Sequence, residues 1–104
     1  MQFLKVITLS IFIFMSNLAF ADAEKSKGLL KSKNCLACHA VDKKLVGPSY
    51  KDVAAKYKGD KTAPDMIAKK IIKGGSGNWG PIPMPPHSIS DADALMLAKY
   101  ILAM

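Results

Sequence analysis

Apolar side chains recur at the three- and four-residue spacing of an amphipathic helix in four stretches of this chain. Three of these stretches follow a residue that caps helices well, namely Ser49, Thr62 and Ser90, each with an aspartate three residues later. No window alternates convincingly with the period of two that a half-buried strand shows. The sequence therefore predicts an all-α fold. The expected helices cover about residues 23–33, 50–58, from the Thr62 cap to 73, and 91–103.

Residues 74–86 interrupt the helical pattern with four glycines and four prolines. Proline fixes φ, lacks an N–H donor and restricts the residue before it. We therefore expect no regular structure here, only a stiff and largely extended loop. Met84 lies in this loop between Pro83 and Pro85.

The two cysteines of the chain lie two residues apart, directly before a histidine, as Cys35, Cys38 and His39. This spacing is typical of c-type haem attachment, in which each thiol forms a thioether with one porphyrin. His39 is then held beside the ring, where its imidazole ligates the iron. We predict one covalently attached haem c per chain.

A dithiol redox pair, half of a zinc site and a structural disulfide are the competing interpretations of these cysteines. A structural zinc needs about four ligands, and beyond this motif the chain offers one more histidine, His87. A thioredoxin-like site would need strands around it, and none is expected. A disulfide that closes so small a loop would constrain the unfolded chain little.

The first residues resemble a secretory signal. Lys5 precedes an apolar run over residues 6–15, and Ala19-Phe20-Ala21 supplies the small residues of a cleavage site. The run is shorter than the ~20 residues of a membrane-spanning helix, which disfavours an uncleaved anchor. We expect residues 1–21 to be removed and residues 22–104 to form one domain without stable membrane anchoring. Cleavage after Ala23 is the alternative.

The charge of the chain is carried by fifteen lysines and eight acidic residues, with no arginine, and the net charge is +7. Such an excess favours acidic partners through long-range attraction. Proteins that bind nucleic acids use arginine for planar, bidentate contacts and interleave aromatic residues for stacking. Because neither feature is present, we do not expect a nucleic-acid partner.

A second axial ligand would decide whether a haem iron bound by His39 is open to substrates. Of the six methionines, Met84 alone lies in the loop, where prolines on both sides stiffen the backbone that presents its sulfur. Met1 and Met15 belong to the signal, and Met104 is the C-terminal residue. Met66 and Met96 lie in helical patterns, where packing is the better interpretation. His87, three residues after Met84, is the competing ligand.

Two further residues are candidates to support the haem. Pro48 offers a backbone carbonyl to the second ring nitrogen of His39 from a stiffened loop, although a plain turn proline is the alternative. Trp79, the single tryptophan, precedes the methionine loop, where its N–H group is a donor for a haem propionate. Lysines of the third helix are candidates to offset propionate charge.

These motifs occur in a characteristic order, and with them the chain resembles the bacterial class I cytochromes c of the short c-551/c-552 (c8) type over about residues 23–104. The resemblance implies about four short helices wrapped around one haem, with His39 and Met84 on the iron. It implies that the Pro48 carbonyl accepts a hydrogen bond from the His39 ring N–H and that Trp79 binds a haem propionate. The motifs are Cys35-Leu36-Ala37-Cys38-His39, Val46-Gly47-Pro48 and Trp79-Gly80-Pro81-Ile82-Pro83-Met84-Pro85-Pro86.

The same resemblance implies that the first and last helices pack together, with Leu30 near Tyr100 and Ile101. Two residues depart from the pattern of the group. Lys70 stands where an arginine often binds a propionate, and His87 stands where an asparagine is common.

The function that the resemblance implies is that of a soluble periplasmic cytochrome, a monomer and not an enzyme, that shuttles single electrons in a respiratory chain. Its expected partners are acidic redox proteins, such as a nitrite reductase or terminal oxidase, and a quinol-oxidising complex. The alternative is a haem enzyme or gas sensor with an open sixth position and His87 as its acid or base. Lysines expected to steer docking are Lys31, Lys33, Lys43, Lys44 and Lys73.

Overall fold

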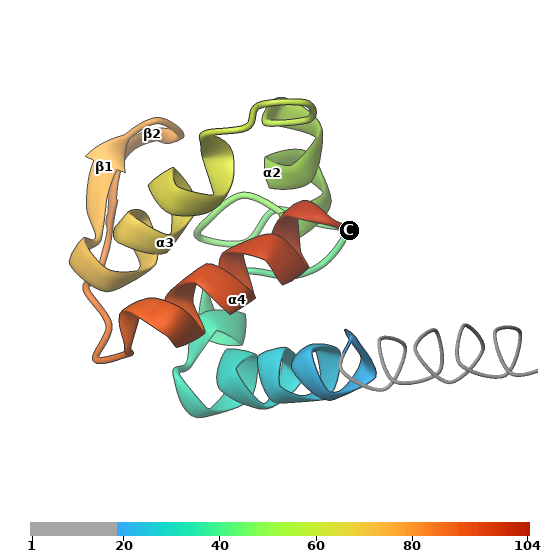
Figure 1. The fold of residues 1–104 in the computed structure, drawn as a ribbon. Helices are drawn as coiled ribbons and strands as arrows, with labels where there is room; N and C mark the ends of the chain where they lie inside the picture. The colour runs from blue at the N-terminus through green and yellow to red at the C-terminus, as the bar shows by residue number, and fades with distance from the viewer. Residues whose placement is uncertain (1–18) are drawn as a thin grey trace, which may run out of the picture.

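The computed structural model describes residues 19–104, so most of the expected signal segment lies outside the described residues. A first helix covers residues 19–32. Among residues 19–104, no helix combines the length and the apolar character needed to cross a bilayer. After the first helix come η1 (Cys35–Ala37), α2 (Tyr50–Lys56), α3 (Ala63–Lys73), β1 (Gly75–Gly77), β2 (Gly80–Met84) and α4 (Asp91–Leu102) (Figure 1).

Two of the three expected N-terminal caps are confirmed. The hydroxyl oxygen of Ser49 accepts the backbone N–H of Asp52, and that of Ser90 accepts the N–H of Asp93, each at 3.1 Å. Helix α2 ends two residues earlier than predicted and is followed by a turn over residues 57–59. Gly59 in that turn has the positive φ of 79° that suits glycine.

The expected capping bond at Thr62 is wrong, although Thr62 is the N-cap residue of α3 as predicted. Thr62 makes no side-chain cap bond to α3 and already has helical dihedral angles. Its hydroxyl and its N–H group instead donate to the Asp60 carboxylate, at 2.7 and 2.9 Å. A carboxylate two residues away is a stronger acceptor and forms a local turn that competes with helix capping. These two bonds also hold the pKa of the exposed Asp60 carboxyl below its usual value.

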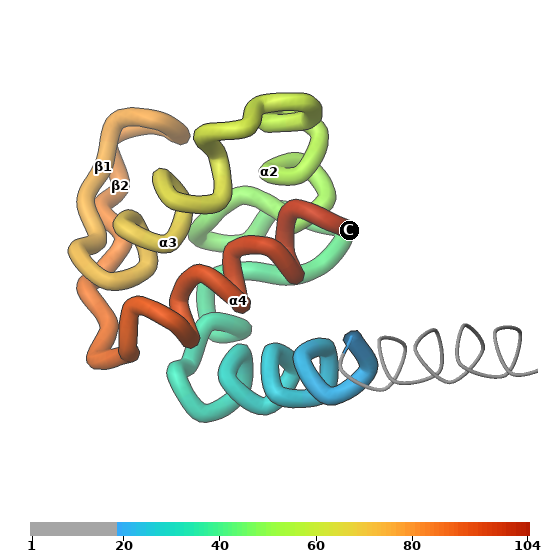
Figure 2. Tube along the Cα trace, viewed as in Figure 1, coloured from blue at the N-terminus to red at the C-terminus, as the bar shows by residue number. Residues whose placement is uncertain are grey.

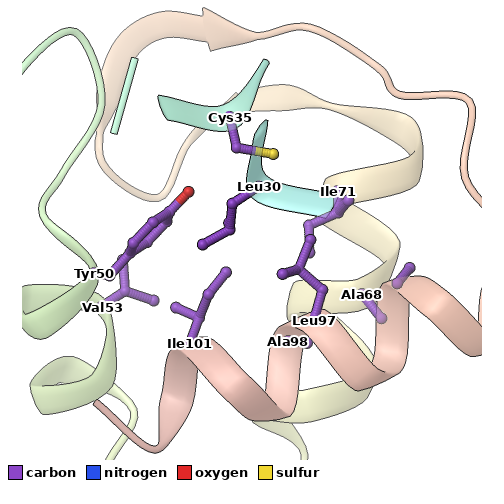
Figure 3. Close-up of a cluster of buried hydrophobic side chains, with 10 residues drawn as sticks. Leu30, Cys35, Tyr50, Val53, Ala68, Ile71, Leu97, Ala98 and Ile101 are labelled. Carbon is purple, nitrogen blue, oxygen red and sulfur yellow. The ribbon is translucent and has the colours of Figure 1, made fainter. Parts of the chain in front are cut away.

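Helix α4 is the centre of the core and contacts both α2 and α3. Ala94 and Ala98 are fully buried and let neighbouring helices approach closely. Leu97 and Ile101 point from α4 into the buried cluster (Figure 3). The first helix lies beside α4 (Figures 1 and 2), and Lys25 forms an ion pair with Asp93 at 3.0 Å. Leu30 belongs to the same buried cluster as Ile101, and Tyr100 packs against that cluster. The predicted pairing of the first and last helices is therefore confirmed.

The expectation that residues 74–86 hold no regular structure is wrong. Strands β1 and β2 pair antiparallel, with Gly75 opposite Met84, Gly77 opposite Gly80 and an irregularity between them. The glycines at 75, 77 and 80 have φ between 111° and 120°, a conformation that other residues rarely adopt. Prolines alternate along β2, so the positions without an N–H group share one edge of the strand and the other edge remains free to pair.

Candidate functional site

A cavity of about 460 Å³ lies between η1, the loop that follows it, α2, α3 and the β1–β2 hairpin. Apolar side chains such as Val53, Ile71 and Leu97 form much of its wall. The structure brings all the predicted site residues to this one cavity. They are Cys35, Cys38, His39, Pro48, Trp79 and Met84.

A single helical turn presents both cysteines to the cavity. Asn34, between the first helix and η1, has left-handed dihedral angles (φ 59°, ψ 25°). Asparagine tolerates this conformation better than most residues. The N–H groups of Cys38 and His39 then both donate to the Cys35 carbonyl, at 3.2 and 3.0 Å. Cys35 and Cys38 form no disulfide. Burial raises the pKa of the Cys35 thiol, whereas a dithiol redox motif needs a lowered one.

The loop over residues 40–49 folds back onto this turn and fixes His39. The Gly47 N–H donates to the Cys38 carbonyl at 2.8 Å, and the Tyr50 N–H donates to the Ala40 carbonyl at 2.9 Å. His39 Nδ1 consequently lies 2.8 Å from the Pro48 carbonyl oxygen. Because a carbonyl only accepts, Nδ1 is the protonated nitrogen, which leaves the Nε2 lone pair available as a ligand.

The His39 ring is also held by packing. A Cβ atom at Gly47 would overlap His39 Cε1 and lie 2.8 Å from its Nδ1, so only glycine lets the loop approach this closely. The Tyr50 ring stacks on His39 with centroids 5.2 Å apart and an interplanar angle of 21°. Burial, with the nearby Cys35 and Cys38 adding repulsion, raises the Tyr50 pKa well above its usual value and keeps the phenol neutral.

Met84 enters the cavity wall at the end of β2. The competing ligand, His87, does not line this cavity. Its ring Nδ1 lies 3.0 Å from the Ile71 carbonyl oxygen, and its backbone N–H donates to the Ile72 carbonyl at 3.2 Å. His87 is thus engaged by the end of α3 and not presented to the cavity.

Trp79 lines the cavity, and 42% of its surface is exposed. Lys56 Nζ is 4.4 Å from the centroid of the indole ring and donates to the Asn78 carbonyl at 2.8 Å. A cation over an indole ring is an attractive contact, so Lys56 ties α2 to the turn of the hairpin. Lys70 also lines the cavity.

This donor set fits a covalently attached metalloporphyrin. Two thiols one turn apart suit thioether formation, and an oriented imidazole and a thioether sulfur are axial ligands of haem iron. Among residues 19–104, no three His, Cys, Asp or Glu side chains are grouped so that they would hold a metal ion by themselves.

The sequence model of the Cytochrome c family matches residues 23–104. The chain belongs to the cytochrome c family. Cytochrome c-551 of Pseudomonas aeruginosa is 53% identical to it over 81 residues, 78% of each chain. Cytochrome c-552 of Hydrogenobacter thermophilus is 49% identical over 89 residues, 86% of this chain and 87% of that protein.

The fold of this cytochrome is similar to that of wild-type Nitrosomonas europaea cytochrome c552 in its crystal structure. The TM-score is 0.71 at 52% sequence identity, over 74% of this chain and 96% of the other. The predicted class I cytochrome c fold of the c-551/c-552 type is therefore confirmed. As a member of this family the cytochrome carries covalently attached haem c, and Cys35 and Cys38 fit the attachment motif.

The sequence patterns do not mark three residues of the site as functional. Gly47 is only part of a motif, Tyr50 is only the first residue of an expected helix, and Lys56 belongs to no motif. For Tyr50 the sequence does hold a signal, since this residue follows the Ser49 cap directly and lies close to Pro48. An aromatic residue at that position begins the helix against the haem-motif loop. Nothing local marks Lys56, since its contacts depend on where the hairpin lies.

Proposed function

We propose that this monohaem cytochrome is a soluble periplasmic electron carrier, not an enzyme, and that His39 and Met84 ligate its iron. The observation that carries the proposal is the 2.8 Å contact of His39 Nδ1 with the Pro48 carbonyl, because it leaves Nε2 free in the cavity that Met84 also lines. Haem iron, when bound, supplies the one-electron couple. Two protein ligands leave no position for a substrate.

The residues around the cavity have distinct roles in this proposal. Cys35 and Cys38 hold the porphyrin through thioethers, and Pro48 keeps the His39 ring oriented. The neutral sulfur of Met84 favours the reduced state and raises the potential. The Trp79 N–H group donates to a propionate, and Lys70, which lines the cavity, offsets propionate charge as a point charge.

We also propose that residues 1–21 are a signal cleaved after Ala21 and that residues 22–104 are the exported domain. The order of Lys5, the apolar run and the small residues supports this proposal. The match to the cytochrome c family, which begins at residue 23, is consistent with it.

The ligand proposal is tested with holoprotein made by export together with the haem-attachment machinery. The native protein is expected to show a low-spin spectrum with a weak near-infrared sulfur-to-iron band. Met84→Ala should abolish that band and lower the reduction potential by a sizeable part of the ~0.8 V range that axial ligands span. Met96→Ala is the matched control, because Met96 lies in the groove between α4 and the first helix.

Two results would contradict the proposal. A near-infrared band that survives in Met84→Ala would show that another residue is the ligand. A high-spin ferric native protein that readily binds cyanide would favour an enzyme or gas sensor.

Docking on acidic redox proteins is the second part of the proposal. Val46 and Ile82 are more than half exposed and line the cavity together with exposed Lys44. Apolar side chains next to a lysine suit a small, short-lived interface that charge attraction guides. A nitrite reductase or terminal oxidase as acceptor and a quinol-oxidising complex as donor are the classes that we propose.

The rate of electron transfer to such an acidic partner is expected to fall as ionic strength rises, since salt screens charges over ~10 Å at 0.1 M. Lys44→Glu should lower the rate at low salt and flatten its salt dependence. Lys99→Glu changes the net charge equally on the α4 groove, away from the cavity, and should have the smaller effect. Equal effects of the two variants would argue against docking at the cavity.

A further inference from the structure

The end of α3 lies directly against the backbone of the Met84 segment. Gly74 follows the last residue of α3, donates its N–H to the Lys70 carbonyl at 2.8 Å, and has φ 69° and ψ −157°. A Cβ atom at Gly74 would overlap the Met84 carbonyl oxygen and lie 2.8 Å from both Pro85 C and Pro86 N. All three atoms are backbone atoms, so they cannot move aside as the end of a flexible side chain can.

Contacts on both sides of Gly74 continue this close fit. Gly75 pairs with Met84 in the hairpin. His87, just past the prolines, bonds to the Ile71 and Ile72 carbonyls of the last turn of α3. Residues 84–87 therefore run along the end of α3 in continuous contact with residues 71–75.

Prolines restrict how the Met84 segment could respond to a displacement. Pro83 and Pro85 have fixed φ angles, and Pro85 restricts the backbone of Met84 itself. A shift of the Met84 carbonyl therefore moves the Met84 backbone from which the side chain reaches toward the cavity.

We propose that Gly74 is a positioning residue for Met84, and that its missing side chain sets how deeply the Met84 backbone is seated against α3. This inference rests on the proposed role of Met84 as axial ligand. Gly74 itself does not line the cavity and acts only through the placement of the Met84 segment.

Gly74→Ala and Gly59→Ala are compared because both glycines have a positive φ, but only Gly74 lies against another segment of the chain. The two glycines have similar positive φ angles, 69° and 79°, but a Cβ atom at Gly59 would meet nothing within 4 Å. Both variants should lose stability because alanine is strained at positive φ, and Gly74→Ala should lose more because φ 69° with ψ −157° is a combination essentially restricted to glycine. Only Gly74→Ala should weaken the near-infrared sulfur-to-iron band of the ferric holoprotein.

Cyanide binding to the ferric holoprotein gives a second measure of ligand placement, read at a temperature where all variants are folded. Gly74→Ala should speed binding on the order of tenfold, the change that ~1.4 kcal/mol of ligand destabilisation produces. Gly59→Ala should bind cyanide at the native rate. Equal bands and equal rates in the two variants would overturn the inference.

A further variant decides the case in which Gly74→Ala does not accumulate as holoprotein. His87→Ala removes the ring bond to Ile71 without adding an atom to the contact, and it keeps the backbone bond to Ile72. Faster cyanide binding in His87→Ala would support the proposal that contact with the end of α3 positions Met84. An unchanged rate would overturn it. The ligand proposal fails separately, if Met84→Ala leaves the near-infrared band intact.

Discussion

Replacing Cys35 and Cys38 together with alanine is expected to yield a chain without covalent haem that is largely unfolded. The two thiols line a cavity of about 460 Å³ that is partly open to solvent. At ~24 cal/mol per Å³, a closed and empty cavity of this size would cost about 11 kcal/mol, which is an upper bound for the open one. This value is comparable to the total free energy of unfolding of a domain, which is roughly 5–15 kcal/mol.

The measurement is the haem that stays with the polypeptide after acidified-acetone extraction, together with far-ultraviolet circular dichroism. The single variants Cys35→Ala and Cys38→Ala are the controls, because each retains one thiol for attachment and should keep part of the covalent haem. A double variant with native helix content and no haem would show that the fold does not depend on the group.

Gly47→Ala is expected to displace the His39 ring, since the added Cβ would overlap its Cε1. The displacement would break or lengthen the 2.8 Å contact with the Pro48 carbonyl and disturb the stacking on Tyr50. Overpacking of this kind costs ~1–3 kcal/mol, and losing the bond that orients an axial histidine adds to it. We expect a lower unfolding midpoint and a changed reduction potential.

Gly28→Ala is the control for Gly47→Ala. Gly28 lies in the first helix, and a Cβ there would meet nothing within 4 Å. Alanine at this helical position should raise stability by ~0.5–1 kcal/mol and leave the potential unchanged. A Gly47→Ala protein with native potential and native stability would mean that the loop yields without moving His39.

Much of the site could be predicted from the sequence because its chemistry is local. The spacing of Cys35, Cys38 and His39 places three groups within one turn, and the dihedral limits of proline mark Met84 as a residue outside any helix. The caps at Ser49 and Ser90 were found for the same reason, since each bond spans three residues. The expected Thr62 cap bond does not form because a nearer acceptor, Asp60, binds the same groups.

The hairpin could not be predicted from periodicity. Gly75, Gly77 and Gly80 have no side chains to alternate, and the prolines of β2 hide the pattern that a strand normally shows. Pairing with a neighbouring segment, not propensity, makes this stretch regular.

The amino-acid sequence by itself determined where the haem is attached, where α2, α3 and α4 begin and which residues are candidate ligands. These features depend on groups a few residues apart, whose spacing is written directly in the chain. The tertiary structure decided how closely backbones approach: Gly47 against His39 and Gly74 against Met84. Such contacts join segments that meet only after folding, and a glycine in the sequence does not say which atoms its missing side chain would have met.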